Sequence, residues 1–230
     1  MRKQKSQNAT SEPKHAVILC HPDPESFNAA VSKTYCEAVR ARFHEAIVRD
    51  LYGLKFDPVL QASEQPSAID FVPFADVATE LDALGNASVI VLVYPIWFGT
   101  PPAMLKGYVD RVLGAGFGHR LMRERGGGSV AAGKHLVSIT TSGNSSQWLE
   151  SQGAMVSLHN VFDNYLANAF SMASHSHLHL SGIVDDLSEL HGRRELYRVT
   201  EIADATCAKL LADRTRTAGD GLVKTMQCSD

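Results

Sequence analysis

The feature that most constrains the fold is the apolar run Val-Ile-Val-Leu-Val-Tyr over residues 89–94. A β-branched run without polar alternation is typical of a strand that is covered on both faces, as in a parallel sheet. Pro95 ends the run, because proline cannot donate to a sheet ladder. Pro102 suits the first turn of a helix after a short loop. The stretch therefore predicts a βα unit, the repeating element of open α/β sheets.

The alternation of short strands with helical patterns continues along the whole chain. It predicts an α/β doubly wound parallel sheet of five strands in the order 2-1-3-4-5. The predicted strands are 16–20, 45–50, 89–94, 134–141 and about 175–184, and the predicted helices are 26–43, 76–85, one from residue 102, 148–165 and 192–212. We expect one domain over residues 15–213, between a disordered tail over 1–14 and a polar tail over 214–230.

The composition of the chain indicates which kinds of partner and which cellular compartment to expect. The net charge is −3 and the pI about 6.4, so no electrostatic footprint for nucleic acid is present. The apolar run 16–20 is too short for a signal peptide or a membrane span. The cysteines show no C-x-x-C pairing and are interpreted as reduced thiols; they are Cys20, Cys36, Cys207 and Cys228. We therefore expect a cytoplasmic protein without membrane insertion.

The loop after the central strand, residues 96–101, has an unusual composition. It contains Trp97 and Phe98, which would suit a flat ring system bound at the carboxyl ends of the strands. A hydrophobic loop that merely closes the sheet edge is the alternative interpretation. The wider segment carries a recognisable series of residues: Pro95, Trp97, Pro102, Ala103, Leu105, Lys106, Gly107, Asp110 and Arg111. This series resembles the signature of the flavodoxin-like NAD(P)H:quinone oxidoreductases, with Phe98 in place of a second tryptophan.

Further matches to this family occur in the same order along the chain. They are His21 with Ser26-Phe27-Asn28, then Asp50-Leu51-Tyr52 with Phe56-Asp57-Pro58, and the loop Thr141-Ser142-Gly143-Asn144. A helix N-terminus at Ser26 favours an anion, and the resemblance implies that this anion is the flavin phosphate. A simple helix cap would explain Ser26 equally well. The absence of a G-x-G-x-x-G pattern argues against a Rossmann dinucleotide site.

The resemblance implies a flavoenzyme that takes hydride from NAD(P)H and passes two electrons to a quinone or similar acceptor in a ping-pong cycle. It implies FAD or FMN as cofactor, a homodimer, and an irregular segment 53–75 over the edge of the site. The implied cofactor-binding residues are His21, Ser26, Phe27, Asn28, Pro95, Ile96, Trp97, Phe98, Thr141, Ser142, Gly143, Asn144 and Trp148.

No side chain is predicted to be catalytic. Ser145 lacks the G-x-S-x-G context of a nucleophile. The better-known members of this family have a tyrosine and a nearby histidine beside the flavin. Here Trp148 occupies the region of the tyrosine, no histidine stands at the matching distance over residues 153–157, and His159 lies one helical turn further on. Because an indole cannot exchange a proton at neutral pH, we expect backbone amides of residues 141–144 to stabilise the reduced flavin. The glycine-rich stretch 114–133 follows a helix, so we interpret it as a flexible loop rather than a phosphate cradle.

Three alternatives stay open. His175, His177 and His179 would share one face of a strand, which suggests a metal site. A polar strand face is the preferred interpretation, because no acidic or cysteine partner lies at ligand spacing in the sequence. A redox-sensing ancillary subunit of a membrane transporter and a flavin-free binding module are alternatives to the enzyme.

Overall fold

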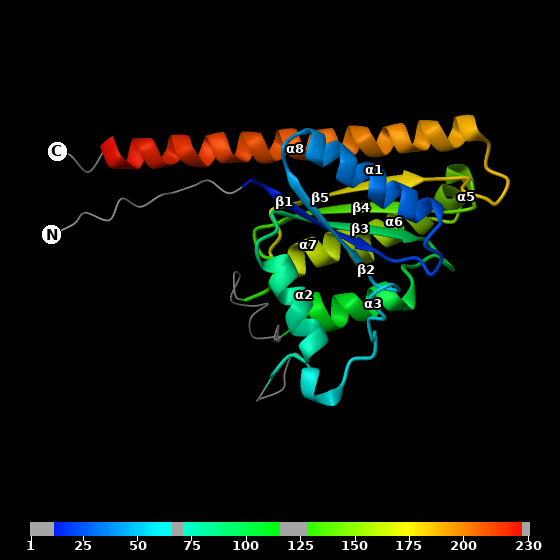
Figure 1. The fold of residues 1–230 in the computed structure, drawn as a ribbon, viewed down its shortest axis with the longest axis horizontal. Helices are drawn as coiled ribbons and strands as arrows, with labels where there is room; N and C mark the ends of the chain where they lie inside the picture. Colours follow the sequence, from blue (N-terminus) through cyan, green and yellow to red (C-terminus); the bar gives the residue numbers. More distant parts are fainter. Residues whose placement is uncertain (1–11, 66–70, 116–127, 227–230) are drawn as a thin grey trace.

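The computed structural model describes residues 12–65, 71–115 and 128–226. Its centre is a parallel sheet in the order β2-β1-β3-β4-β5, so the predicted fold class and strand order are confirmed (Figure 1). The strands are β1 (Lys14–Leu19), β2 (Glu45–Asp50), β3 (Val89–Pro95), β4 (His135–Thr141) and β5 (Ser174–Leu180). Every residue of β3 and β4 is buried, as the unbroken apolar run of β3 predicts.

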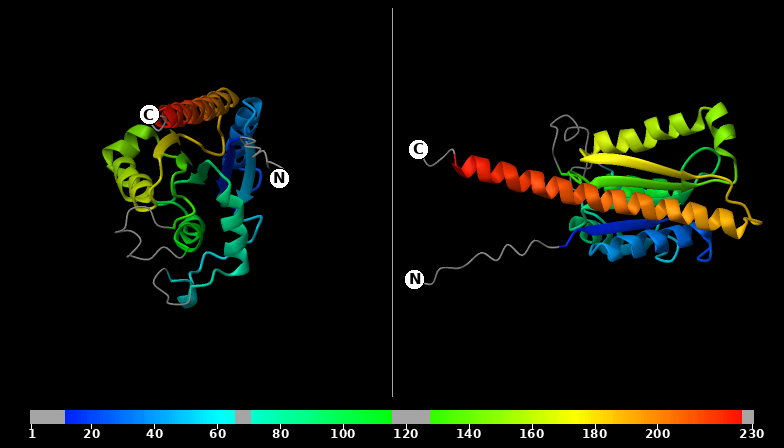
Figure 2. Two further views of the ribbon diagram at one scale, coloured as in Figure 1. Left: turned by 90° about the vertical axis from the view of Figure 1, so that its left-hand side faces the viewer. Right: turned by 90° about the horizontal axis from the view of Figure 1, so that it is seen from above.

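Helices cover both faces of the sheet (Figures 1 and 2). On one face, α1 (Phe27–Ala41) and the long α8 (Glu189–Met226) lie side by side and share an apolar core with β1 and β3. On the other face the core includes side chains from six helical segments. These segments are α2 (Ala75–Gly85), α3 (Ala103–Tyr108), η2 (Val109–Leu113), α6 (Ala154–Leu158), η3 (His159–Asn164) and α7 (Tyr165–Ala169). The helices η1 (Ala62–Glu64) and α5 (Ser146–Ser151) complete the described elements.

The largest differences from the predicted element boundaries are in the last third of the chain. The helix expected over 148–165 is broken, because Gly153 adopts φ +65° between α5 and α6, a conformation that favours glycine. The last helix continues to Met226, so residues 214–226 are helical rather than a tail. The fifth strand ends at Leu180 and not near residue 184, because the chain turns at Gly182, where φ is +68°.

Other sequence predictions fall partly outside the described residues. The first strand begins at Lys14, within the predicted tail 1–14, of which residues 1–11 lie outside the described part of the chain. The same holds for residues 116–127 of the glycine-rich stretch and for 227–230. Cys228 is among these residues, whereas the other three cysteines are free thiols.

A buried ion network fixes residues 57–64 and the start of α2 against the helical segment after β3, while residues 66–70 of the predicted irregular segment 53–75 lie outside the described part of the chain. The guanidinium of Arg111 is 2% exposed and donates to Glu64 at 2.8 Å and to Asp76 at 2.6 Å. These partners raise its pKa, the hydrogen bond to Glu64 most. Gly107 packs directly on Pro58, whose carbonyl oxygen would lie 2.3 Å from a Cβ at this position. A side chain at residue 107 would therefore push the segment away from the helix.

Candidate functional site

A polar crevice of about 400 Å³ opens at the carboxyl ends of β1, β3 and β4. The order of the strands reverses between β1 and β3, and ligands of open α/β sheets bind at such a switch point. Ten of the thirteen predicted cofactor residues line this crevice, which makes it the candidate site: His21, Ser26, Phe27, Asn28, Pro95, Ile96, Trp97, Thr141, Ser142 and Gly143. The structure does not bring Phe98, Asn144 or Trp148 to its wall.

The N-terminus of α1 forms one side of the crevice. Ser26 is the N-cap, and its Oγ accepts the N–H of Ala29 at 3.3 Å. The hydroxyl hydrogen of Ser26 and the backbone N–H groups of Phe27 and Asn28 then point to the open end of the helix, where the helix dipole favours an anion. Three acidic residues, Asp23, Glu25 and Asp185, line the same crevice and were not anticipated from the sequence. Their carboxylates would repel an anion, so the N-terminus of α1 is the part of the crevice that favours one.

Asn28 joins two elements at the crevice. The residue is only 3% exposed, and its Nδ2 donates to Thr141 Oγ1 at 2.9 Å. This hydrogen bond joins the first turn of α1 to the end of β4. It uses one of the two Nδ2 hydrogens, and Asn28 also lines the crevice.

The aromatic loop after β3 is a tight turn. Trp97 and Thr100 exchange two backbone hydrogen bonds, at 3.0 and 3.1 Å, while Phe98 and Gly99 have φ of +52° and +82°. Two consecutive positive φ angles are typical of a type I′ turn. The turn points Phe98 into solvent, and Trp148 is 51% exposed beyond the crevice. Of Trp97, Phe98 and Trp148, only Trp97 lines the crevice, together with Phe27 of α1.

Behind the crevice lies a buried carboxylate that the sequence analysis missed. Asp163 of η3 is fully buried and accepts from Ser138 of β4 at 2.6 Å. Its other oxygen lies 2.6 Å from Nδ1 of His177 on β5. The expectation that the histidines have no acidic partner is therefore wrong in three dimensions. The packing of η3 on β5 supplies that partner, and no spacing in the sequence could reveal it.

A hydrogen-bond chain continues from His177 to the cofactor loop. Thr140 Oγ1 lies 2.8 Å from His177 Nε2 and 2.9 Å from His179 Nδ1. His179 Nε2 lies 3.1 Å from Ser142 Oγ, and Ser142 donates to the carbonyl oxygen of Asn144 at 3.1 Å. The chain therefore ends on a loop that lines the crevice.

The direction of each hydrogen bond along this chain follows from Ser142, the residue at its end. Because Ser142 donates to a carbonyl, it must accept from His179 Nε2–H. His179 Nδ1 then accepts from Thr140, and Thr140 accepts from His177 Nε2–H. The 2.6 Å contact between His177 and Asp163 must consequently contain the remaining proton. The chain thus places one proton on the His177–Asp163 pair and orients the loop 142–144.

Two further histidines, His159 and His175, lie close to this chain of hydrogen bonds. The ring of His159 lies over that of His177, with centroids 4.4 Å apart. Burial, with help from His177, Arg198 and His159, lowers the pKa of His179 to about 4. His179 is therefore neutral at pH 7, as the donor directions require. His175 is exposed and belongs to the same strand face without entering the chain of hydrogen bonds from Asp163 to Ser142.

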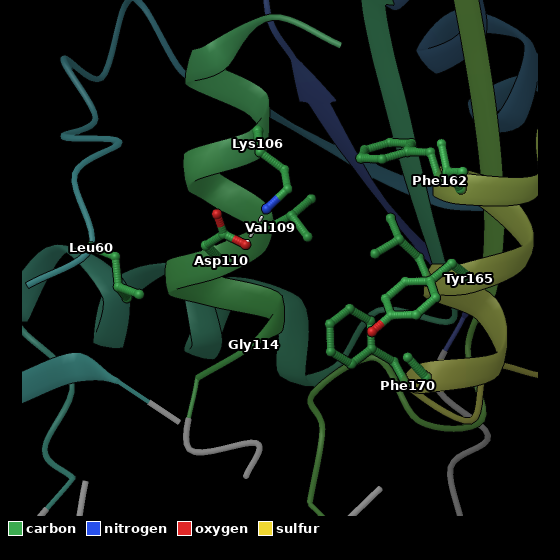
Figure 3. Close-up of a pocket in the computed structure, with 11 residues that line it drawn as sticks. Leu60, Lys106, Val109, Asp110, Gly114, Phe162, Tyr165 and Phe170 are labelled. Carbon is green, nitrogen blue, oxygen red and sulfur yellow. Dashed lines mark hydrogen bonds and ion pairs between the residues drawn. The ribbon is translucent and has the colours of Figure 1, made fainter. Parts of the chain in front are cut away.

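A second, more apolar hollow of about 290 Å³ lies between two helical segments on one face of the sheet. Figure 3 shows Lys106, Val109 and Asp110 of one segment facing Phe162, Tyr165 and Phe170 of the other, with Leu60 at the rim. Val161 is 70% exposed and Tyr165 57% exposed beside it. This hollow is separate from the crevice, because none of its lining residues is shared.

The parallel sheet, the crevice at its switch point and the helix N-terminus define a doubly wound protein of the kind that binds a phosphate-bearing cofactor. The chain belongs to the family described as having a flavodoxin-like fold, whose model matches residues 13–198. The family recognised from the motifs in the sequence is therefore confirmed. No helix in the described part of the chain is long and apolar enough to cross a membrane.

Individual relatives agree with this assignment. An uncharacterized NAD(P)H oxidoreductase of Haemophilus influenzae is 28% identical over 91% of this chain and 98% of its own length. NAD(P)H dehydrogenase [quinone] 1 of Cavia porcellus is 30% identical over 57% of this chain, which spans 54% of that relative.

Solved structures are similar in fold. An NAD(P)H:quinone oxidoreductase from Methanothermobacter marburgensis superposes with a TM-score of 0.72 at 22% identity, covering 84% of this chain and 95% of that one. An FMN-dependent NADH-azoreductase from Bacillus anthracis, in complex with FMN, gives a TM-score of 0.60 at 18% identity, covering 85% and 99%.

Proposed function

We propose that the protein is a flavin-dependent NAD(P)H oxidoreductase that transfers two electrons to a quinone or a similar acceptor. The observation that carries this proposal is the crevice at the switch point, where the loops after β1, β3 and β4 converge. The names of the Haemophilus influenzae and Cavia porcellus relatives support the same chemistry. The flavin, when bound, would supply the hydride and electron transfer, and the protein supplies binding and electrostatics.

The residues of the crevice fit FMN or FAD. The Ser26 hydroxyl and the first-turn amides of α1 would hold a phosphate. Ile96 and Trp97 would lie along a flat ring, and the loop from Thr141 to Gly143 would face its polar edge. Backbone donors at that edge stabilise negative charge, and the chain behind Ser142 keeps the loop in place. A single crevice for donor and acceptor favours a ping-pong cycle.

Absorption spectroscopy and mass analysis of the released cofactor test this proposal most directly. We expect a flavin at one equivalent per chain, reduced by NADH or NADPH and reoxidised by a quinone. A chain that takes up neither FMN nor FAD on reconstitution would overturn the proposal and favour a flavin-free binding module. Bound flavin with slow turnover and a transporter partner would favour the redox-sensing subunit instead.

A charge introduced at the helix cap tests the phosphate position. Ser26→Asp keeps an N-cap acceptor, since aspartate caps helices as well as serine does, but it places a negative charge beside the phosphate. We expect flavin affinity to fall at least about 100-fold, roughly 2.7 kcal/mol. Ser145 caps α5 in the same way and does not line the crevice, so Ser145→Asp is the matched control. Equal flavin affinities in the two variants would contradict the proposal that the phosphate binds at the N-terminus of α1.

We also propose that two copies of the chain form a homodimer through the apolar hollow beside Val161 and Tyr165. Exposed apolar patches of this kind mark interaction sites. Light scattering should give twice the chain mass, and Val161→Glu should yield monomers. Val156 is 67% exposed on the preceding segment but does not line the hollow, so Val156→Glu should remain dimeric. A monomeric mass for fully active wild-type protein would contradict this interface.

The three described cysteines are free and buried thiols. This is consistent with a reducing compartment, and we place the protein in the cytoplasm on that basis.

A further inference from the structure

A second group of histidines lies at the amino end of the sheet, away from the crevice. His15 is on β1, His44 directly precedes β2, and Cys207 is on α8. One nitrogen of each histidine and the sulfur all lie within 4.8 Å of one another. His15 is fully buried and Cys207 is 5% exposed. Three potential metal-binding atoms from three separate elements therefore converge in the interior.

Each ring nitrogen of His15 has one partner. Nδ1 lies 3.0 Å from Tyr35 Oη, and Nε2 lies 2.9 Å from His44 Nδ1. In the tautomer in which Nδ1–H donates to Tyr35 Oη, Nε2 presents its lone pair to His44 Nδ1. A histidine that donates its other N–H to an oxygen is the usual arrangement of a metal ligand.

The surroundings keep both imidazoles neutral. Burial, reinforced by His44 and His135, lowers the pKa of His15 to about 3. Burial also lowers the pKa of His44, and of the charged groups near it, Arg214 lowers this pKa and Glu12 raises it. Neutral imidazole is the form that binds metal ions. At pH 7 the two rings are therefore held together by one N–H···N hydrogen bond, in the protonation state of ligands.

A strained residue positions His44. At the end of α1, Phe43 N–H bonds to Arg40 O and His44 N–H bonds to Val39 O, which is the hydrogen-bond pattern of a Schellman motif. Phe43 occupies its left-handed position with φ +61°, although glycine is preferred there. This turn directs His44 back toward His15, while the Phe43 side chain is 82% exposed.

We propose that His15 Nε2, His44 Nδ1 and Cys207 Sγ form a binding site for a zinc ion. Two imidazoles and a thiolate are typical zinc ligands, and three protein ligands leave a fourth position for water. With Zn–N bonds of about 2.0–2.1 Å, the two nitrogens would stand about 3.3 Å apart. The present 2.9 Å separation therefore has to widen by a few tenths of an ångström, which the part-buried His44 permits.

The protons balance as follows. Zinc replaces the hydrogen between the two rings, and the proton of His44 moves to its own Nε2. Burial raises the pKa of the Cys207 thiol to about 11, so this thiol is protonated before binding. Its proton is released to solvent when the Zn–S bond forms. One zinc ion therefore displaces one net proton and joins β1, the start of β2 and α8.

The only other His, Cys, Asp or Glu group of this kind in the described part of the chain is His159, Asp163 and His177. There His177 contacts a buried carboxylate, Asp163, through Nδ1 and Thr140 Oγ1 through Nε2. That cluster contains no thiol, so it cannot give a thiolate-to-cobalt charge-transfer band. It therefore serves as the internal comparison for metal binding.

Titration of metal-free protein with Co²⁺, followed by displacement with Zn²⁺, tests the site. We expect one ion per chain, a thiolate-to-cobalt charge-transfer band, and a higher melting temperature, since a ligand that binds only the folded state stabilises it. Cys207→Ser should abolish the charge-transfer band and lower affinity at least about 100-fold. His44→Gln, at a less buried position, provides a second variant if Cys207→Ser does not fold.

Two matched controls make the result decisive. Cys36 is an equally buried thiol on α1, so Cys36→Ser should bind cobalt as wild type does. His159→Gln alters the other cluster and should also bind normally. Absence of a cobalt complex in wild-type protein would overturn the proposal. Unchanged binding in both Cys207→Ser and His44→Gln, or loss of binding in His159→Gln, would do the same.

Discussion

The two buried histidine clusters, one at the middle of β5 and one at the amino end of β1, contain the same residue type in opposite surroundings. At the middle of β5, His177 contacts a fully buried carboxylate, Asp163, at 2.6 Å. At the amino end of β1, His15 contacts only neutral partners, Tyr35 and His44. The first arrangement holds a proton and orients a loop, whereas the second joins two imidazoles by one hydrogen bond. The chemical role of a buried histidine is thus decided by its partner and not by its burial.

The largest expected effect is the loss of folding stability at acid pH, to which the neutral His15 of the first strand contributes. The pKa of His15 is about 3 in the folded protein, against 6.5 when unfolded. Only the unfolded state binds a proton between these values, so the contribution of His15 to stability is complete above pH 6.5. It is lost as the pH falls toward 3, by up to about 4 kcal/mol. Urea unfolding at several pH values measures this loss.

His15→Gln provides the comparison for that titration. The variant should lose part of the slope of stability against pH between 6.5 and 3. His175→Gln, which removes an exposed histidine, should retain it. An unchanged slope in His15→Gln would mean that the buried ring does not resist protonation.

Removal of the buried Asp163 carboxylate should destabilise the folded protein, because His177 then loses the partner that distinguishes it from His15. Asp163→Asn leaves the proton of His177 without a counter-charge in the interior, and breaking a buried pair costs about 3 kcal/mol or more. The exposed ion pair of Arg42 and Asp204 is the control, because solvent screens it. Asp204→Asn should therefore change the urea midpoint much less. Equal midpoints for both variants would show that Asp163 carries no charge that folding depends on.

Two threonines allow each hydrogen-bond chain to be cut separately. Thr140→Val removes the hydroxyl between His177 and His179, and Thr206→Val removes the hydroxyl that is hydrogen-bonded to Tyr35. Each should cost about 1–2 kcal/mol, because buried partners are left unsatisfied. Thr140→Val should weaken flavin binding and leave cobalt binding unchanged. Thr206→Val should weaken cobalt binding and leave flavin binding unchanged. If both variants lost the same ligand, the two clusters would be coupled.

The smallest expected effect comes from two strained phenylalanines, one next to His44 and one in the loop after β3. Phe43 and Phe98 are exposed and have φ of +61° and +52°. Glycine at either position relieves the left-handed strain and loses more chain entropy, so we expect a net gain of about 0.5 kcal/mol from each. Thermal unfolding of Phe43→Gly and Phe98→Gly measures this gain. A loss at either position would indicate that the side chain makes stabilising contacts.

Much of the architecture could be predicted because its signals are local. The β3 run of residues 89–94 and the cap at Ser26 depend on neighbours in the sequence, and both were confirmed. The loops that line the crevice were found because they follow predicted strands, and parallel strands end at one edge. The break at Gly153 was missed, since a glycine within a helical pattern does not by itself indicate a left-handed turn.

What the sequence by itself determined is the sheet, its strand order and the family, since hydrophobic periodicity and short motifs act over a few residues. Only the tertiary structure decided which polar side chains meet. Asp163 and His177 are 14 residues apart, and His15 and Cys207 lie near opposite ends of the chain. Their contacts arise when helices pack on the sheet and exclude water. In that environment a hydrogen-bond partner fixes where each proton resides.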